Sequence, residues 1–271
     1  QRRDEILSDL YRHSPDMLAV SCYIWNWELV SALLPDIPKI LPETEIWLGG
    51  PEVSYDPDLV LAQFPMVKGI MTGEGEETFR ELASGSIELS NICGIVYRQD
   101  GIVRTDRREL MDLSKISFFY HDLSAFANKI IYYESSRGCP YRCSYCLSSI
   151  DKSVRFRDID MVKRELQVFL DKQVLQVKFV DRTFNCNHQH ALEIWQYLLE
   201  HDNGVTNFHF EIEADILSEE ELSLLACMRP GLIQMEIGVQ TTNPQSLQEI
   251  RRHGDMERLR EVVMVDGCGK W

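Results

Sequence analysis

Short apolar runs alternate along this chain with longer segments in which apolar residues recur every three or four positions. The runs 17–21, 45–48 and 67–71 have the length of buried strands, and each is followed by the periodicity of a helix. Strands that alternate with helices are typical of a doubly wound parallel sheet, which binds ligands at the carboxyl ends of its strands. We therefore expect a Rossmann-like α/β domain over residues 1–90.

The same alternation restarts later in the chain. A hairpin is predicted around the turn Asp100-Gly101, and it opens a connecting segment over 91–128. Within 129–271 four further strands are predicted, each followed by a helix, at 130–134, 175–180, 207–214 and 232–239. Four successive strand–helix units indicate a (β/α) barrel of the TIM type, or part of one. Its site is expected at the carboxyl ends of the strands.

The composition favours an intracellular enzyme. Eight cysteines are present without the spacing of a disulfide framework, and no apolar run reaches the ~20 residues that a membrane span requires. The formal net charge of −15 disfavours a nucleic-acid partner, because it repels polyanions. We interpret the two basic clusters, 104–108 and 251–253, as solvated faces. With neither a signal peptide nor a membrane span, we expect a cytoplasmic protein without a membrane partner.

The most informative motif is a compact set of three cysteines, Cys139, Cys143 and Cys146. Three thiolates are one fewer than a closed iron–sulfur or structural zinc site requires. The spacing therefore predicts an iron–sulfur cluster with one iron left open for another ligand. A zinc knuckle, a disulfide-linked loop or a chance cluster are the alternatives. They are disfavoured because no second Cys or His pair lies nearby at zinc-site spacing.

With Arg137-Gly138 before the first cysteine and Tyr145 before the last, this Cys-x3-Cys-x2-Cys run resembles the radical-AdoMet superfamily. The resemblance implies that Cys139, Cys143 and Cys146 hold a 4Fe–4S cluster whose fourth iron binds S-adenosylmethionine. Reduction would then cleave this cofactor to a 5′-deoxyadenosyl radical. It also implies a small-molecule substrate and an electron donor such as flavodoxin or ferredoxin. Barrels of this family have six units, so we expect this chain to be a fragment that lacks the last units.

Polar residues at the predicted barrel strand ends are candidates for cofactor contacts. Charged and apolar residues alternate along 207–214 and so face opposite sides of the sheet. A charged inward row is costly unless it meets a ligand or water. By resemblance to the family, the AdoMet contacts are expected to be Tyr145, Asp181, Arg182, Glu213 and Gln240. The alternative is that these are solvated strand ends or internal salt bridges.

The N-terminal domain resembles the cobalamin-binding domain found before many radical-AdoMet barrels. The matching residues lie at the ends of the three predicted strands, and the resemblance implies these cobalamin contacts: Ser21, Gly49, Gly50, Gly73 and Glu74. The Asp-x-His-x-x-Gly loop of that family has no match in this chain, and the first strand, which would precede it, is expected to be missing. Ordinary turn chemistry is the alternative explanation for the glycines.

These resemblances lead to one main hypothesis and two alternatives. The main hypothesis is cobalamin-dependent methyl transfer to an unactivated centre of a small molecule. In it, one AdoMet methylates cobalt and another gives the radical that activates the substrate. The first alternative is a radical rearrangement, cyclisation or oxidation without methyl transfer through cobalamin. The second is a non-catalytic iron–sulfur binding module, which is disfavoured because a structural metal needs no polar barrel mouth.

Overall fold

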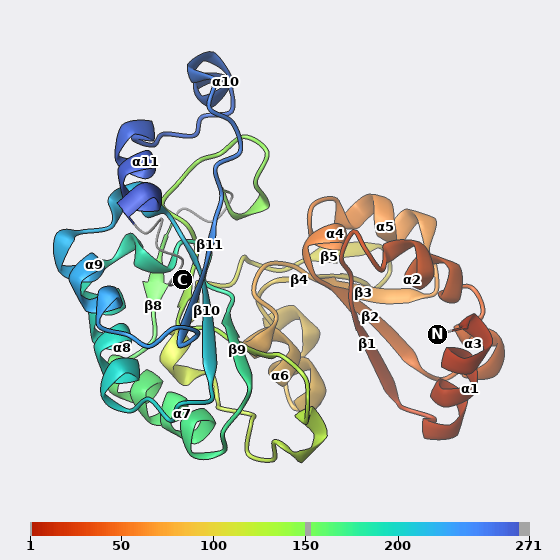
Figure 1. Ribbon diagram of the computed structural model, residues 1–271. Helices are drawn as coiled ribbons and strands as arrows, with labels where there is room; N and C mark the ends of the chain where they lie inside the picture. The colour runs from red at the N-terminus through yellow and green to blue at the C-terminus, as the bar shows by residue number, and fades with distance from the viewer. Residues whose placement is uncertain (1, 150–152, 266–271) are drawn as a thin grey trace. The chain divides into compact units, whose positions relative to one another are not determined.

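The computed structural model describes residues 2–149 and 153–265. The chain forms two compact units, Gln1–Met111 and Asp112–Trp271, which Figure 1 colours from red to blue along the sequence. Each unit has its own sheet and its own hydrophobic core. Every helix in the described part of the chain is too short or too polar to cross a membrane.

The sheet of the first unit has five strands in the order β1-β2-β3-β4-β5. Strands β1 (Met17–Ser21), β2 (Glu45–Gly49) and β3 (Val67–Met71) are parallel, as the alternation predicts. The hairpin strands β4 (Ile95–Arg98) and β5 (Ile102–Arg104) continue the sheet in antiparallel fashion. The hairpin, which the sequence places in the connecting segment, thus lies within the first unit. It does so because the apolar residues of β4 are buried and pair with β3.

Helices cover both faces of this sheet. They are α1 (Arg3–His13), α2 (Trp27–Leu33), α3 (Ile37–Ile40), α4 (Pro51–Ser54), α5 (Pro57–Gln63) and α6 (Glu76–Ser84), with a 3-10 turn η1 (Leu89–Asn91). Alternate residues of β2 enter two separate cores. Ile46 and Leu48 pack with Leu34, whereas Trp47 packs with Leu82 of α6. The first unit therefore has the predicted doubly wound arrangement.

Four parallel strands form the main sheet of the second unit, in the order β11-β10-β9-β6. They are β6 (Ile131–Tyr133), β9 (Gln176–Phe179), β10 (Asn207–Ile212) and β11 (Ile233–Ile237). The helices of this unit are α7 (Ile159–Asp171), α8 (His188–Glu200), α9 (Glu219–Ala226), α10 (Pro244–Glu249) and α11 (Met256–Val265). Strands that follow one another in this series are neighbours in the sheet, as a partial barrel requires. Helix α11 follows the four predicted units.

A short antiparallel pair, β7 (Ser136–Arg137) with β8 (Arg155–Phe156), was not predicted. It brackets the segment that carries the three cysteines. The unit also contains the 3-10 turns η2 (Leu113–Lys115), η3 (Ser124–Phe126), η4 (Leu147–Ser149), η5 (Phe184–Cys186) and η6 (Ala214–Ile216). Two of these turns, η5 and η6, follow β9 and β10 directly and contribute to the site.

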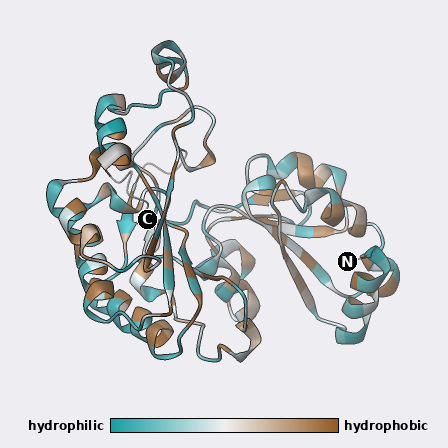
Figure 2. Ribbon diagram, in the orientation of Figure 1, coloured by the Kyte–Doolittle hydropathy of each residue, from teal (hydrophilic) through white to brown (hydrophobic). Residues whose placement is uncertain are grey.

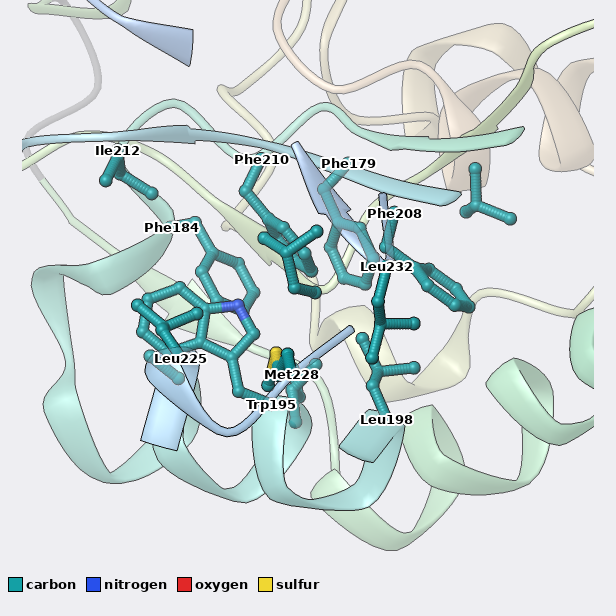
Figure 3. Packing of buried hydrophobic residues seen from close by; sticks show 14 of the residues in the cluster. Phe179, Phe184, Trp195, Leu198, Phe208, Phe210, Ile212, Leu225, Met228 and Leu232 are labelled. Carbon is teal, nitrogen blue, oxygen red and sulfur yellow. The ribbon is translucent and has the colours of Figure 1, made fainter. Parts of the chain in front are cut away.

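One face of this sheet is apolar and packs against the helices. Phe208 and Phe210 of β10 are fully buried and lie in one aromatic cluster with Phe179, Phe184 and Trp195 (Figure 3). The alternate residues of β10 are only partly buried and lie on the opposite face. In Figure 2 both hydrophobic and hydrophilic stretches are seen along the helices of this unit. The predicted alternation along this strand is therefore confirmed, and it leaves a polar face beside the strand ends.

Candidate active site at the carboxyl ends of the second sheet

The three cysteines lie on one loop, defined here as the Cys loop (residues 138–149), which follows β7. Gly138 begins it with a φ of 103°, and a Cβ atom at this position would lie 2.0 Å from the carbonyl oxygen of Ser153. A side chain fits neither the left-handed backbone nor this close approach, so the position requires glycine. Cys139 and Cys143 are buried and Cys146 is half-buried.

The donor set of this loop fits an iron–sulfur cluster. All three thiols are free, so the loop is not disulfide-linked. A 4Fe–4S cubane takes one thiolate on each iron, so its ligands need not converge on one point. In the part of the chain that the structure describes, no group of three His, Cys, Asp or Glu residues is placed to hold a single metal ion. The arrangement therefore gives no support to a mononuclear zinc site.

Asp181 fixes the entry to the Cys loop from inside the domain. Its carboxylate accepts hydrogen bonds from the Ser135 backbone at 3.0 Å and from the hydroxyls of Ser135 and Ser136 at 2.6 and 2.5 Å. Burial raises the pKa of Asp181 to about 6, although these hydrogen bonds oppose the rise. The side chain is 0% exposed. Its observed contacts thus join the end of β9 to the strand that leads into the loop, and its expected contact with AdoMet stays a prediction.

Glu213 is buried and paired at the end of β10. Its two carboxylate oxygens lie 2.8 and 2.7 Å from Nη2 of Arg252. The amide of Asn185 holds its backbone in both directions, donating to the Glu213 carbonyl at 2.8 Å and accepting from its N–H at 3.0 Å. Burial raises the pKa of Glu213 although Arg252 lowers it. The alternative explanation for Glu213, an internal salt bridge, is therefore present in the structure, and its partner is Arg252.

The interpretation of 251–253 as a solvated face is wrong for Arg252, whose side chain is 14% exposed. Helix α10 ends at Glu249, Arg251 follows with a φ of 56°, and the N–H of Arg252 donates to the carbonyl of Leu247 at 3.0 Å. This left-handed turn reverses the chain and directs Arg252 back toward the strand ends. The sequence did not reveal the turn because it uses arginine where glycine is usual.

Three other predicted AdoMet contacts are accessible. Tyr145 is 53% exposed, and Arg182 and Gln240 are also exposed. Gln240 has a φ of 62°, and its amide nitrogen would lie 2.8 Å from a Cβ atom at Gly238. These side chains are thus available to a ligand at the strand ends, whereas Asp181 and Glu213 are used in internal contacts.

The polar face of the sheet is not a row of unpaired charges. The ammonium group of Lys178 lies 3.0 Å from Glu236 and 3.5 Å from Glu211, and Nε2 of His209 lies 3.3 Å from Glu236. The alternation along 207–214 predicts charged residues on this face, such as Glu211, but not Lys178, which neutralises them. The desolvation cost expected for an inward charged row is therefore reduced by pairing.

The predicted cobalamin residues occupy adjacent strand ends in the first unit. Ser21 and Gly49 are partners in the register of β1 and β2, and Gly50 follows at a φ of 92°. Gly73, with a φ of 79°, follows β3, and the space that its Cβ would occupy is open. The Glu74 carboxylate instead accepts the N–H of Met111 at 3.1 Å. A Cβ atom at Gly50 would lie 2.6 Å from the carbonyl oxygen of Cys22, so this edge is open at Gly73 but closely packed at Gly50, while Glu74 holds the end of the unit.

Two family models match the chain. One, described as the B12 binding domain, matches residues 1–83, and the other, described as the radical SAM superfamily, matches residues 133–264. The chain belongs to the radical SAM superfamily and carries a B12-binding domain. Both resemblances seen in the sequence are confirmed, and each match lies within the segment to which that resemblance was assigned.

The chain is similar to curated proteins of two kinds. An uncharacterized methyltransferase from Pyrococcus horikoshii is 31% identical over 161 residues, which cover 54% of this chain and 35% of the relative. An anaerobic magnesium-protoporphyrin IX monomethyl ester cyclase from Synechocystis is 24% identical over 277 residues, which cover 96% of this chain and 55% of the relative. This chain thus spans about a third of the first relative and about half of the second.

A solved structure shares the fold over nearly the whole chain. The radical S-adenosylmethionine methyltransferase TsrM from Kitasatospora setae, solved with cobalamin and a 4Fe–4S cluster, has a TM-score of 0.75 and is 17% identical. The match covers 97% of this chain and 57% of TsrM. At this identity the likeness shows the fold alone, and it confirms the predicted α/β fold class.

Sequence reasoning missed an aromatic group at the open edge of the B12-binding domain. The rings of Tyr23 and Trp25, just after β1, are stacked with centroids 4.5 Å apart. Trp25 is 77% exposed, Ile24 is 81% exposed and Tyr55 is 87% exposed. Tyr23, Ile24 and Trp25 lie a few residues after Ser21, so they are further candidates for contact with a ligand at the end of β1. The signal in the sequence was the run Tyr23-Ile24-Trp25 directly after a strand.

Proposed function

We propose that this chain is the cofactor-binding part of a cobalamin-dependent radical SAM methyltransferase that acts on a small molecule at an unactivated centre. The observation that carries the proposal is the joint presence of two features in one chain. These are a loop of three free cysteines at the strand ends of a radical SAM domain, and a B12-binding domain whose strand ends carry glycines, with open space at Gly73. The methyltransferase names of the P. horikoshii protein and TsrM support the reaction class.

In this proposal each cofactor has its own residues. Cys139, Cys143 and Cys146 hold the 4Fe–4S cluster, and the accessible Tyr145 and Gln240 meet AdoMet beside it. The strand ends of the first unit, with the glycines at 49, 50 and 73, accept cobalamin. When bound, these groups supply one-electron cleavage of AdoMet and a carrier for the methyl group. A one-electron donor such as flavodoxin or ferredoxin is expected as a partner.

In the same site, the protein's own residues have positioning roles. Asp181 fixes the strand that leads into the Cys loop, and Asn185 fixes the backbone of Glu213. Burial of Cys139 and Cys143 limits water access to the sulfur atoms, and solvent exposure is one of the factors that set a cluster's potential. These contacts pre-organise a site before any cofactor binds.

A second candidate function is a radical cyclisation or oxidation without methyl transfer. The observation that favours it is the cyclase from Synechocystis, whose similarity extends over 96% of this chain and so includes both units. The two candidates share the cluster and AdoMet and differ in whether a methyl group reaches the substrate.

The test is anaerobic reconstitution of the full-length protein with iron, sulfide and hydroxocobalamin, followed by reduction in the presence of AdoMet. We expect cluster absorbance, corrinoid uptake and formation of 5′-deoxyadenosine in the wild type. Cys143→Ala should lose 5′-deoxyadenosine formation, because one iron loses its thiolate. Cys227→Ala is the matched control, because Cys227 is exposed and lies outside the Cys loop.

Two outcomes decide between the candidates. Equal 5′-deoxyadenosine formation by Cys143→Ala and the wild type contradicts the radical function altogether. A protein that forms 5′-deoxyadenosine but takes up no corrinoid rules out methyl transfer through cobalamin and leaves the second candidate.

A further inference from the structure

The segment after α10 contacts both the strand ends and the Cys loop. The N–H of Ser144, between the second and third cysteines, donates to the carbonyl of Ile250 at 2.9 Å. Two residues later, Nη2 of Arg252 lies within 2.8 Å of both Glu213 oxygens and 2.5 Å from the carbonyl oxygen of Gly238. The segment 250–252 therefore ties the middle of the loop to β10 and β11.

The guanidinium of Arg252 also lies within electrostatic reach of the loop's own side chains. The hydrogen bond from Ser144 to Ile250 holds the residue after Cys143 against the segment that carries Arg252, two residues after Ile250. Arg252 thus pairs with a strand-end carboxylate, and its own segment is hydrogen-bonded to the residue that follows the middle cysteine of the motif.

The backbone supports this placement. Arg251 occupies the left-handed region that glycine normally takes at the end of a helix, and Arg252 closes the turn with its bond to Leu247. An uncommon backbone conformation persists where the surrounding contacts over-determine it. Here those contacts are the Ser144–Ile250 hydrogen bond and the ion pair of Arg252 with Glu213.

We propose that Arg252 is a positioning residue of the active site: it fixes the Cys143–Tyr145 part of the Cys loop against β10 and β11 and places a permanent positive charge beside the middle cluster ligand. The proposal rests on the proposed function, because it assigns the cluster to the Cys loop. A positive charge near a cluster favours its reduced form, since reduction adds negative charge. Arg252 would therefore raise the reduction potential of the cluster and limit motion of the loop.

The first experiment compares Arg252→Gln, Arg251→Gln and the wild type by an EPR-monitored redox titration of the reconstituted full-length protein. Arg251→Gln removes the same charge from an exposed neighbour. For Arg252→Gln we expect the ratio of reduced to oxidised cluster at a fixed potential to fall by about three- to tenfold, as loss of one partly buried charge implies. Arg252→Lys should recover most of this ratio, because lysine keeps the positive charge. It should not restore the simultaneous contacts of Arg252 with Glu213 and Gly238.

The second experiment needs no cofactor. Hydrogen–deuterium exchange of the peptide that contains Ser144 is measured in the chain without iron. We expect at least about tenfold faster exchange in Arg252→Gln than in Arg251→Gln, because the loop loses its anchor. This measurement remains possible even if the Arg252→Gln protein assembles too little cluster for the redox titration.

The outcomes separate this inference from the proposed function. Equal potentials and equal exchange in Arg252→Gln and Arg251→Gln overturn the role of Arg252, even in a wild type that forms 5′-deoxyadenosine. A wild type that binds a cluster but transfers no methyl group contradicts the methyltransferase proposal and leaves the assignment of Arg252 intact. A wild type that binds no cluster contradicts the proposed function. In that case the exchange measurement alone decides whether Arg252 holds the loop.

Discussion

The carboxyl ends of the two sheets are built in opposite ways. In the B12-binding domain Ser21, Gly50 and Gly73 lie at the ends of the parallel strands, and the space beside Gly73 is open, whereas a Cβ atom at Gly50 would meet Cys22. In the radical SAM domain the corresponding positions carry Asp181 and Glu213, which are buried and hydrogen-bonded. An open edge suits a large, rigid ligand that approaches the backbone, whereas a closed edge suits a loop that must hold several metal ligands in fixed positions.

The largest test of this difference is removal of the buried carboxylate. Asp181→Ala leaves the hydroxyls of Ser135 and Ser136 without their acceptor inside the domain. We expect the free energy of unfolding to fall by about 2–4 kcal/mol, because buried polar groups that lose a charged partner are costly. Urea denaturation followed by circular dichroism measures this change.

The matched control comes from the open edge. Ser21→Ala changes an exposed side chain at the end of β1 and should alter the free energy of unfolding by less than about 0.5 kcal/mol. If Asp181→Ala and Ser21→Ala lowered the free energy of unfolding by similar amounts, the two sheet edges would not differ in how much their polar contacts stabilise the fold.

The sequence predicted both folds well, because strand and helix periodicity depends on local patterns that burial reinforces. The alternation along β10 is an example, since Phe208 and Phe210 entered the core as expected. The site of the radical SAM domain was predicted less well. Its cysteines were recognisable from their spacing, but the role of Arg252 depends on a tertiary contact with Glu213, 39 residues earlier in the chain. Spacing alone does not encode such a pairing.

The two edges also differ in what their glycines do, which gives a smaller test. Gly138 and Gly73 both have positive φ, but a Cβ atom at Gly138 would meet the backbone of Ser153, whereas one at Gly73 would meet open space. Gly138→Ala should cost about 2–3 kcal/mol through strain and steric overlap. Gly73→Ala should cost only about 1 kcal/mol, from the backbone conformation alone.

Thermal or urea unfolding of the two alanine variants measures these costs, and corrinoid titration adds a functional readout. If the open space at Gly73 serves a ligand, Gly73→Ala should weaken corrinoid uptake while Gly138→Ala weakens cluster assembly. Equal costs of unfolding for both variants would show that the crowding at Gly138 relaxes freely.

The smallest expected effect is a pH dependence confined to the closed edge. Burial raises the pKa of Asp181 to about 6, so its protonated form is favoured in the fold, and this contribution to stability is complete below about pH 4 and lost as the pH rises to about 6. Burial lowers the pKa of His190 to about 4, so its contribution is complete above about pH 6.5 and is lost as the pH falls. The hydroxyl of Ser135 joins the two groups, lying 2.6 Å from Asp181 and 3.1 Å from His190.

Between about pH 4 and 6 the two contributions have opposite signs and should nearly cancel in the wild type. Substitution of either residue removes one of the two contributions and leaves the pH dependence of the other visible. In His190→Gln the free energy of unfolding should fall by about 1–2 kcal/mol as the pH rises through this range, and in Asp181→Asn it should rise by a similar amount. Urea titrations at a series of pH values measure both slopes. Parallel pH profiles for the wild type and both variants would contradict the assignment of these pH dependences to Asp181 and His190. The groups whose titrations cancel would then lie elsewhere in the protein.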